Sequence, residues 1–207
     1  TYSYVIPAVI FTIVSSTLTA YGFGRFKFFG RSVLFAILMS TLFLPQVVLN
    51  VPQYIMYNIF GWVGSKLYLP LIVPSMFATE TYFVFMLIQF LRNIPKELEE
   101  AAKIDGCNEI QTLIKVIVPM LKPALVSCAL FKFMWASNDF LGPLLYVNNP
   151  AKYPATIFVK LAMDSDAGFA WNRILSTSLI SILPSIIIFF IAQNQFVEGI
   201  SAGGVKG

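Results

Sequence analysis

Five long apolar segments, separated by short polar or basic connections, constrain the fold of this 207-residue chain more than any other feature. They run over residues 4–21, 33–56, 67–91, 123–145 and 174–192. A membrane-spanning helix needs about 20 mostly apolar residues. Only 12% of the residues are charged, against about 25% in a soluble domain. The sequence therefore predicts an all-α polytopic membrane protein with about five transmembrane helices, residues 1–207 forming one domain in a lipid bilayer.

Two prolines, Pro45 and Pro52, interrupt the second apolar segment, and the amides of Gln46 and Asn50 lie in the same broken region. Proline is tolerated in a membrane helix where neighbouring groups satisfy the freed carbonyls. A broken helix that carries amides is typical of binding or gating regions in transporters. A structural kink, with the amides bonding across helices, fits the pattern about equally well. Gln46 and Asn50 are therefore candidates for a translocation path.

Glu80 lies inside the third apolar segment, and Asn138 and Asp139 lie in the fourth. An ionisable side chain at membrane depth costs at least about 2.5 kcal/mol, so it is a functional candidate and should face a cavity or the bundle interior. Glu80 could instead bond to a neighbouring subunit for assembly alone, and Asp139 could be a hydrated helix terminus. These three residues complete the set of path candidates.

The longest stretch of soluble character, from Pro95 to Pro123, predicts two short helices joined by a turn. Pro95 suits the first position of a helix, where its missing N–H costs nothing. Gly106 suits the end of that helix because it adopts the left-handed conformation without steric cost. Asn108 can cap the second helix, with Gln111 as its capping-box partner.

An apolar face is predicted on the second of these helices, formed by Ile110, Leu113, Ile114 and Ile117 at helical spacing. Alanines beside a glycine turn also let the backbone of another protein come close. Two short amphipathic helices between two spans therefore favour a docking element. An ordinary loop that folds on its own protein fits the spacing about as well.

Basic residues are distributed unevenly over the connections. Nine lie in the proposed inner parts (Arg25, Lys27, Arg31, Arg92, Lys96, Lys103, Lys115, Lys122 and Lys206), and four lie in the outer ones (Lys66, Lys152, Lys160 and Arg173). The positive-inside rule then places the N-terminus outside. It places the segment from Pro95 to Pro123 and a polar tail over 193–207 in the cytoplasm. An odd number of spans that starts outside suggests a preceding helix. The net charge of +4 is small, and nothing indicates a nucleic-acid partner.

Several kinds of chemistry are excluded by what the sequence lacks. It has no histidine, and Cys107 and Cys128 have no metal-binding spacing, which excludes a zinc site and imidazole base catalysis. No G-x-x-x-x-G-K-[ST] loop is present, so any ATP must be hydrolysed by another chain. No catalytic motif in the sequence supports the hypothesis of an intramembrane enzyme that uses Glu80 or Asp139. We therefore expect no catalytic residue and no metal in this chain.

A known motif resembles part of the soluble segment. The residues Glu100, Ala101, Ala102, Asp105, Gly106 and Pro119 resemble, in type and spacing, the EAA motif of ABC importer permeases. Cys107 replaces the usual alanine and Val118 the usual leucine. Asn138-Asp139-Phe140 is similar to a further family pattern, with Ser137 in place of a tryptophan. The glycine-rich C-terminal end resembles that of the carbohydrate branch, represented by the maltose permeases.

The resemblance implies a MetI-like permease core with cytoplasmic coupling helices over residues 95–119, in a bacterial cytoplasmic membrane. It also implies a second, usually different, permease subunit, two ATPase subunits that bind the ATP and Mg²⁺, and an extracellular substrate-binding protein. This chain itself would hold no cofactor. The expected function is inward movement of a sugar or oligosaccharide by alternating access. An ion-coupled secondary transporter that uses Glu80 is the alternative.

Overall fold

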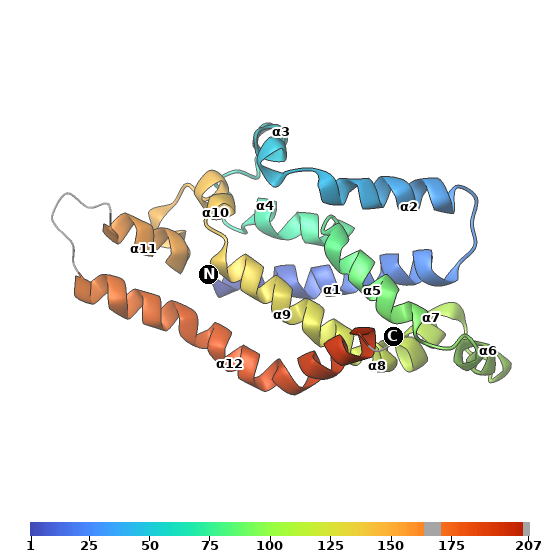
Figure 1. Ribbon diagram of the computed structural model, residues 1–207. Helices are drawn as coiled ribbons and strands as arrows, with labels where there is room; N and C mark the ends of the chain where they lie inside the picture. The colour runs from blue at the N-terminus through green and yellow to red at the C-terminus, as the bar shows by residue number, and fades with distance from the viewer. Residues whose placement is uncertain (164–170, 205–207) are drawn as a thin grey trace.

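The structure is a computed structural model that describes residues 1–163 and 171–204, and helices dominate this part of the chain (Figure 1). The longer helices are α1 (Tyr2–Arg25), α2 (Arg31–Ser40), α3 (Gln46–Ile59), α5 (Thr81–Arg92), α9 (Lys122–Asn138) and α12 (Trp171–Gly204). The shorter ones are α4 (Leu69–Ile72), α6 (Glu97–Ile104), α7 (Glu109–Thr112), α8 (Val118–Met120), α10 (Leu141–Tyr146) and α11 (Ala155–Met163). The polytopic all-α prediction is confirmed.

Helix α1 lies at the centre and packs against α5 and α9, while α12 packs along the far side of α9 (Figure 1). Small residues on α1, including the fully buried Ser16 and Ala20, let its neighbours approach closely. Leu87 and Ile88 of α5 and Cys128 of α9 complete the contact. This three-helix centre is the scaffold on which the other elements are placed.

Three stretches are long and apolar enough to cross a membrane: Tyr2–Arg25, Leu69–Arg92 and Trp171–Gln193. Two bent helix pairs raise that number to as many as five in the described residues if each pair is one span. Many large apolar side chains also face outward, among them Ile6, Ile10, Val14 and Leu18 on one side of α1. Such a surface suits lipid or a neighbouring subunit and not water.

The second predicted segment, 33–56, is not one interrupted helix but two helices bent by 103°. A 3₁₀ turn, Thr41–Phe43, follows α2, and Leu44 is extended before Pro45. This geometry follows from the proline, which disfavours the helical conformation in the residue before it. Pro52, in contrast, lies inside α3 without ending it. The break therefore has one cause and not the two that the sequence suggested.

Two other apolar segments are also divided. The 67–91 segment contains α4, a 3₁₀ turn over Val73–Phe77 and then α5, with Ala78 left-handed at the junction (φ 52°). The 123–145 segment contains α9 and α10, with Asp139 extended between them. The chain thus changes direction close to each of the acidic path candidates, Glu80 and Asp139.

Both terminal helices are longer than their apolar segments. Helix α1 extends beyond residues 4–21 at both ends. Helix α12 continues past 192 to Gly204, so most of the predicted polar tail over 193–207 is helical. Residues 193–202 contain one glycine and no proline, and a single glycine costs a helix only about 1 kcal/mol. Polarity alone therefore did not end the helix.

Candidate functional site

The soluble segment folds as the predicted pair of short helices with a glycine turn. Gly106 has φ 83°. The N–H of Cys107 donates to the Ala102 carbonyl at 2.9 Å, and the N–H of Gly106 donates to the Lys103 carbonyl at 3.0 Å. These two bonds form the Schellman motif that ends a helix at a left-handed residue. No atom lies within 4 Å of the position of a Cβ on Gly106, so its conformation, not crowding, calls for glycine.

Asn108 and Gln111 form the predicted capping box at the start of α7. Each side chain accepts from the backbone N–H of the other residue at 2.9 Å. Pro95, in contrast, is not the first residue of α6, which begins at Glu97. The start at Glu97 still places Glu97, Glu99 and Glu100 in the first turn, where carboxylates complement the helix dipole.

A buried ion pair fastens α6 to the end of α1. Arg25 pairs with Glu99, and the two side chains are 8% and 10% exposed. The Arg25 guanidinium also donates to the Ile94 carbonyl at 2.8 Å. Burial raises the pKa of the Glu99 carboxyl, and the nearby Arg25 guanidinium opposes that rise. The Tyr21 hydroxyl donates to the Glu109 carboxylate at 3.4 Å, so α7 is tied to the same helix.

The predicted apolar face of the second helix is wrong for two of its four residues, which are exposed instead of buried. Leu113 and Ile117 are buried against Tyr21 and other residues of the core, but Ile110 and Ile114 are 68% and 60% exposed. A π-helical turn over Leu113–Ile117, whose hydrogen bonds join residues five apart, interrupts the α-helical spacing on which the predicted face depends. Ile110 lies in α7, before this turn, and is exposed there.

Four large apolar side chains of the segment are exposed, and we name them together the coupling face: Leu98, Ile104, Ile110 and Ile114. Their exposed fractions are 40%, 87%, 68% and 60%. Lys103 and Glu109 pair at 2.7 Å across the turn, with their side chains 50% and 46% exposed. The hydrogen bond to Glu109 raises the pKa of the Lys103 ammonium. This pair, the turn at Gly106 and the capping box of α7 together link α6 to α7.

The six motif residues have different surroundings. Glu100, Ala101, Asp105, Gly106 and Pro119 are exposed, and the first four lie on α6 or in the turn that ends it. Ala102 is buried, 7% exposed. The small side chain of Ala102 lets α6 pack closely against the rest of this chain. Ala102 therefore does not contribute to the outward surface, whereas Ala101 does.

Glu80 is the N-cap residue of α5, directly after the break at Ala78. It pairs with Lys132 of α9, whose side chain is 9% exposed, while that of Glu80 is 32% exposed. The Thr12 hydroxyl of α1 donates to the same carboxylate at 3.1 Å. The charge is thus neutralised within this chain, and Glu80 joins all three central helices.

The other path candidates bond elsewhere. Gln46 donates to Gln53 on the exposed side of α3 at 3.2 Å. Asn138 donates to the Met134 carbonyl at 2.8 Å, and Asp139 accepts from the Gly142 N–H at 3.1 Å and so caps α10. Asn50 is partly buried on α3. Within the described residues, no side-chain hydrogen bond joins any two of the five candidates.

The sequence pattern did not indicate Lys132, Arg25 and Glu99 as paired charges. A signal was available for Lys132, because two opposite charges in neighbouring spans avoid the cost of burial by pairing. Arg25 is the first of three basic residues in one inner connection, a pattern that indicates the cytoplasmic side and no particular partner. Nothing in the sequence marked Glu99, rather than its neighbouring glutamates, as the buried partner.

A protein family and several known permease proteins match this chain over nearly its whole length. The family described as binding-protein-dependent transport system inner membrane component matches residues 2–200. The trehalose/maltose transport system permease protein MalG of Thermococcus litoralis is 31% identical over 196 residues, 95% of this chain and 70% of that protein. The osmoprotective compounds uptake permease protein GgtD of Synechocystis is 34% identical over 207 residues, 97% of this chain and 67% of that protein.

A solved structure shares the fold. It is a bacterial ABC transporter involved in the import of the acidic polysaccharide alginate, and it superposes with a TM-score of 0.76 at 22% identity. The match covers 94% of this chain and 74% of that chain.

The Glu80–Lys132 pair yields a stability prediction. Glu80→Gln leaves the buried Lys132 ammonium without its counter-charge, so we expect a loss of about 3–5 kcal/mol, and Lys132→Met should cost a similar amount. The double variant Glu80→Gln/Lys132→Met should lose less than either single variant, because no unpaired charge remains. Thermal unfolding of the detergent-solubilised protein measures all three. Additive losses in the double variant would contradict the pairing.

Proposed function

The chain belongs to the family of binding-protein-dependent transport system inner membrane components, and on that premise we propose that it is the permease subunit of an ATP-driven importer for a sugar or oligosaccharide. One observation carries the proposal: the four large apolar side chains of the coupling face are exposed on a segment whose two parts are linked by the turn at Gly106 and the Lys103–Glu109 pair. An exposed apolar patch of this kind, rimmed by polar residues, marks a protein interaction site. We assign it to the ATPase.

The mechanism follows from how the coupling face is attached. A push on α6 reaches α1 through Arg25 and Glu99, and a push on α7 reaches it through Glu109 and Tyr21. Coupling requires an element with two arrangements that both sites bias. In our proposal, ATP closes the two ATPase subunits, the coupling face follows them, and the central helices rock between outward-open and inward-open states.

The same proposal assigns the remaining partners. The second permease subunit covers part of the exposed apolar surface, and a substrate-binding protein docks on the opposite, outer end. ATP and Mg²⁺ are bound by the ATPase subunits, and this chain holds neither. The coupling face and the C-terminus then lie on the cytoplasmic side, in agreement with the excess of basic residues at that end.

The substrate class is inferred from the relatives' names. Those names include a trehalose/maltose system and a sulfoquinovosyl glycerol system, the latter from Agrobacterium fabrum at 31% identity. An arabinooligosaccharides permease from Halalkalibacterium halodurans is 28% identical. All three names describe solutes that contain a sugar, and we propose such a solute for this chain.

The ion-coupled alternative has no support from these findings. The carboxylate that it would use, Glu80, is already paired with Lys132 and bonded to Thr12. The family to which the chain belongs transports together with a binding protein. Glu80 is better explained as a structural charge at the junction of three helices.

Substitution at the centre of the coupling face tests the ATPase contact. Ile104 is 87% exposed and touches little of its own protein, so Ile104→Asp should fold normally. It should nevertheless reduce copurification of the ATPase at least about ten-fold, because a carboxylate then has to be buried unpaired in the interface. Ile104→Leu is the matched control and should retain the ATPase. Full retention of the ATPase by Ile104→Asp would contradict the assignment.

Proline at the turn tests the coupling itself. Proline fixes φ near about −65°, whereas Gly106 has φ 83° and donates its N–H to Lys103. We expect Gly106→Pro to insert into the membrane but to lose at least about ten-fold in solute uptake, a coupling energy within the usual range.

Gly61→Pro is the control for this variant. Gly61 is also left-handed (φ 67°) with a bonded N–H, but it lies in the connection after α3. Proline there should leave the ratio of uptake to ATP hydrolysis unchanged. Equal effects of the two prolines on this ratio would show that the turn at Gly106 has no special role.

A further inference from the structure

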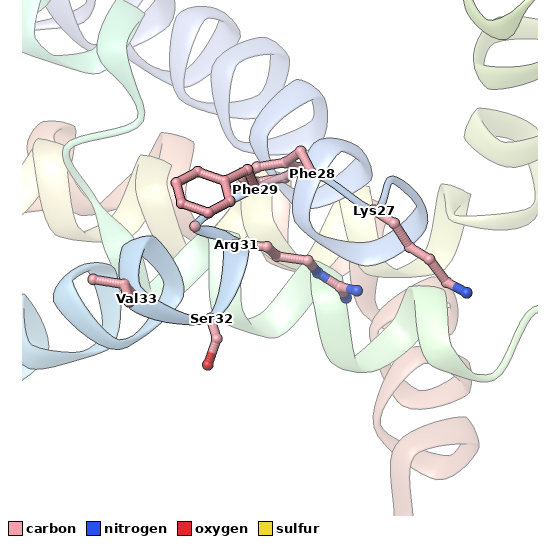
Figure 2. Close-up of a pocket in the computed structure, with 7 residues that line it drawn as sticks. Lys27, Phe28, Phe29, Arg31, Ser32 and Val33 are labelled. Carbon is pink, nitrogen blue, oxygen red and sulfur yellow. The ribbon is translucent and has the colours of Figure 1, made fainter.

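A basic, aromatic turn between α1 and α2 lies outside the site described above (Figure 2). It borders a shallow, open hollow of about 650 Å³. The lining residues run from Lys27 to Val33. The turn connects the ends of two apolar helices, so it lies where the chain leaves the hydrocarbon core and meets the headgroups.

The cations of this turn have no counter-charge in the described part of the chain. Arg25, immediately before the turn, is occupied by Glu99, but neither Lys27 nor Arg31 forms an ion pair there. Residues 1–79 contain no aspartate or glutamate at all. In Figure 2 the Lys27 and Arg31 side chains extend in the same general direction from the turn. Their charges are therefore available to an external anion.

The aromatic residues of the turn divide into two groups. Phe28 packs on Phe23 at a ring separation of 5.7 Å, and Phe23 packs in turn on Phe35 of α2 at 5.8 Å. Phe29, in contrast, is fully exposed, and its ring lies away from the two cations (Figure 2). A fully exposed phenylalanine beside cations suits a membrane interface, where the ring enters the acyl boundary.

The turn is also preorganised. Gly30 has φ 78°, the N–H of Arg31 donates to the Phe28 carbonyl at 3.3 Å, and the N–H of Leu34 donates to the Gly30 carbonyl at 2.9 Å. Phe26 packs edge-on against Tyr21. The backbone that carries Phe29 is therefore fixed by hydrogen bonds within the turn.

We propose that this turn is a binding site for an anionic phospholipid. Lys27 and Arg31 contact the phosphate and the acidic headgroup, and Phe29 lies against the upper acyl chain. Juxtamembrane cations that lack internal partners are the residues that attract anionic lipids. Neither the transported solute nor the ATPase enters this inference, so it stands or fails independently of the proposed function.

Fluorescence quenching tests the proposal. Phe29→Trp is prepared in the purified membrane protein together with its copurifying subunits. The variant is reconstituted into phosphatidylcholine vesicles that contain phosphatidylglycerol, with bromine on the acyl chains of one lipid or the other. The parent protein, with its three tryptophans, supplies the background to subtract. We expect stronger quenching of the new tryptophan by brominated phosphatidylglycerol than by brominated phosphatidylcholine.

Charge variants in the same background complete the test. Lys27→Gln/Arg31→Gln should reduce the preference for phosphatidylglycerol by about five-fold for each cation. Lys115→Gln/Lys122→Gln removes two exposed cations from the soluble segment and should leave the preference unchanged. Equal quenching by both lipids would overturn the proposal, as would a tryptophan that neither lipid reaches because a partner protein covers it.

Discussion

The buried pair of Arg25 and Glu99 is the interaction on which the rest of the structure depends. Taking two charges out of water is costly, and their attraction repays that cost only with good geometry and further hydrogen bonds. Arg25 makes one such further hydrogen bond, to the Ile94 carbonyl. The pair joins the end of the central helix to α6, whose eight residues would form only a marginal helix by themselves.

This attachment gives the soluble segment two different sides. Leu113 and Ile117 face inward and belong to the core with Tyr21, while Ile110 and Ile114 are exposed. A segment with only one apolar side would either bury it and offer nothing to a partner, or expose it and detach from its own protein. Two apolar sides allow the same few residues to be fixed to this chain and to receive force from another.

The parts of the fold that depend on local chemistry were predictable from the sequence. The left-handed Gly106 and the Asn108–Gln111 box follow from single-residue preferences and fixed spacing. The parts that depend on long-range contact were not. The partner of Glu80 is 52 residues away, and the outward turn of Ile114 depends on a π turn that no residue type announces. The break in the second apolar segment was predicted only in part. The chain bends before Pro45, as expected, but Pro52 lies inside α3 without ending it.

The central claim is that the coupling face moves as one body with α1. Spin labels at Lys27, just beyond α1, and Glu97, in the first turn of α6, test it in a background without Cys107 and Cys128, because both label sites are exposed and unpaired in the described residues. With and without ATP, the distance between these labels should stay the same, while the distance from Glu97 to a label on the neighbouring permease subunit changes. A Lys27–Glu97 distance that shifts with ATP would contradict the account.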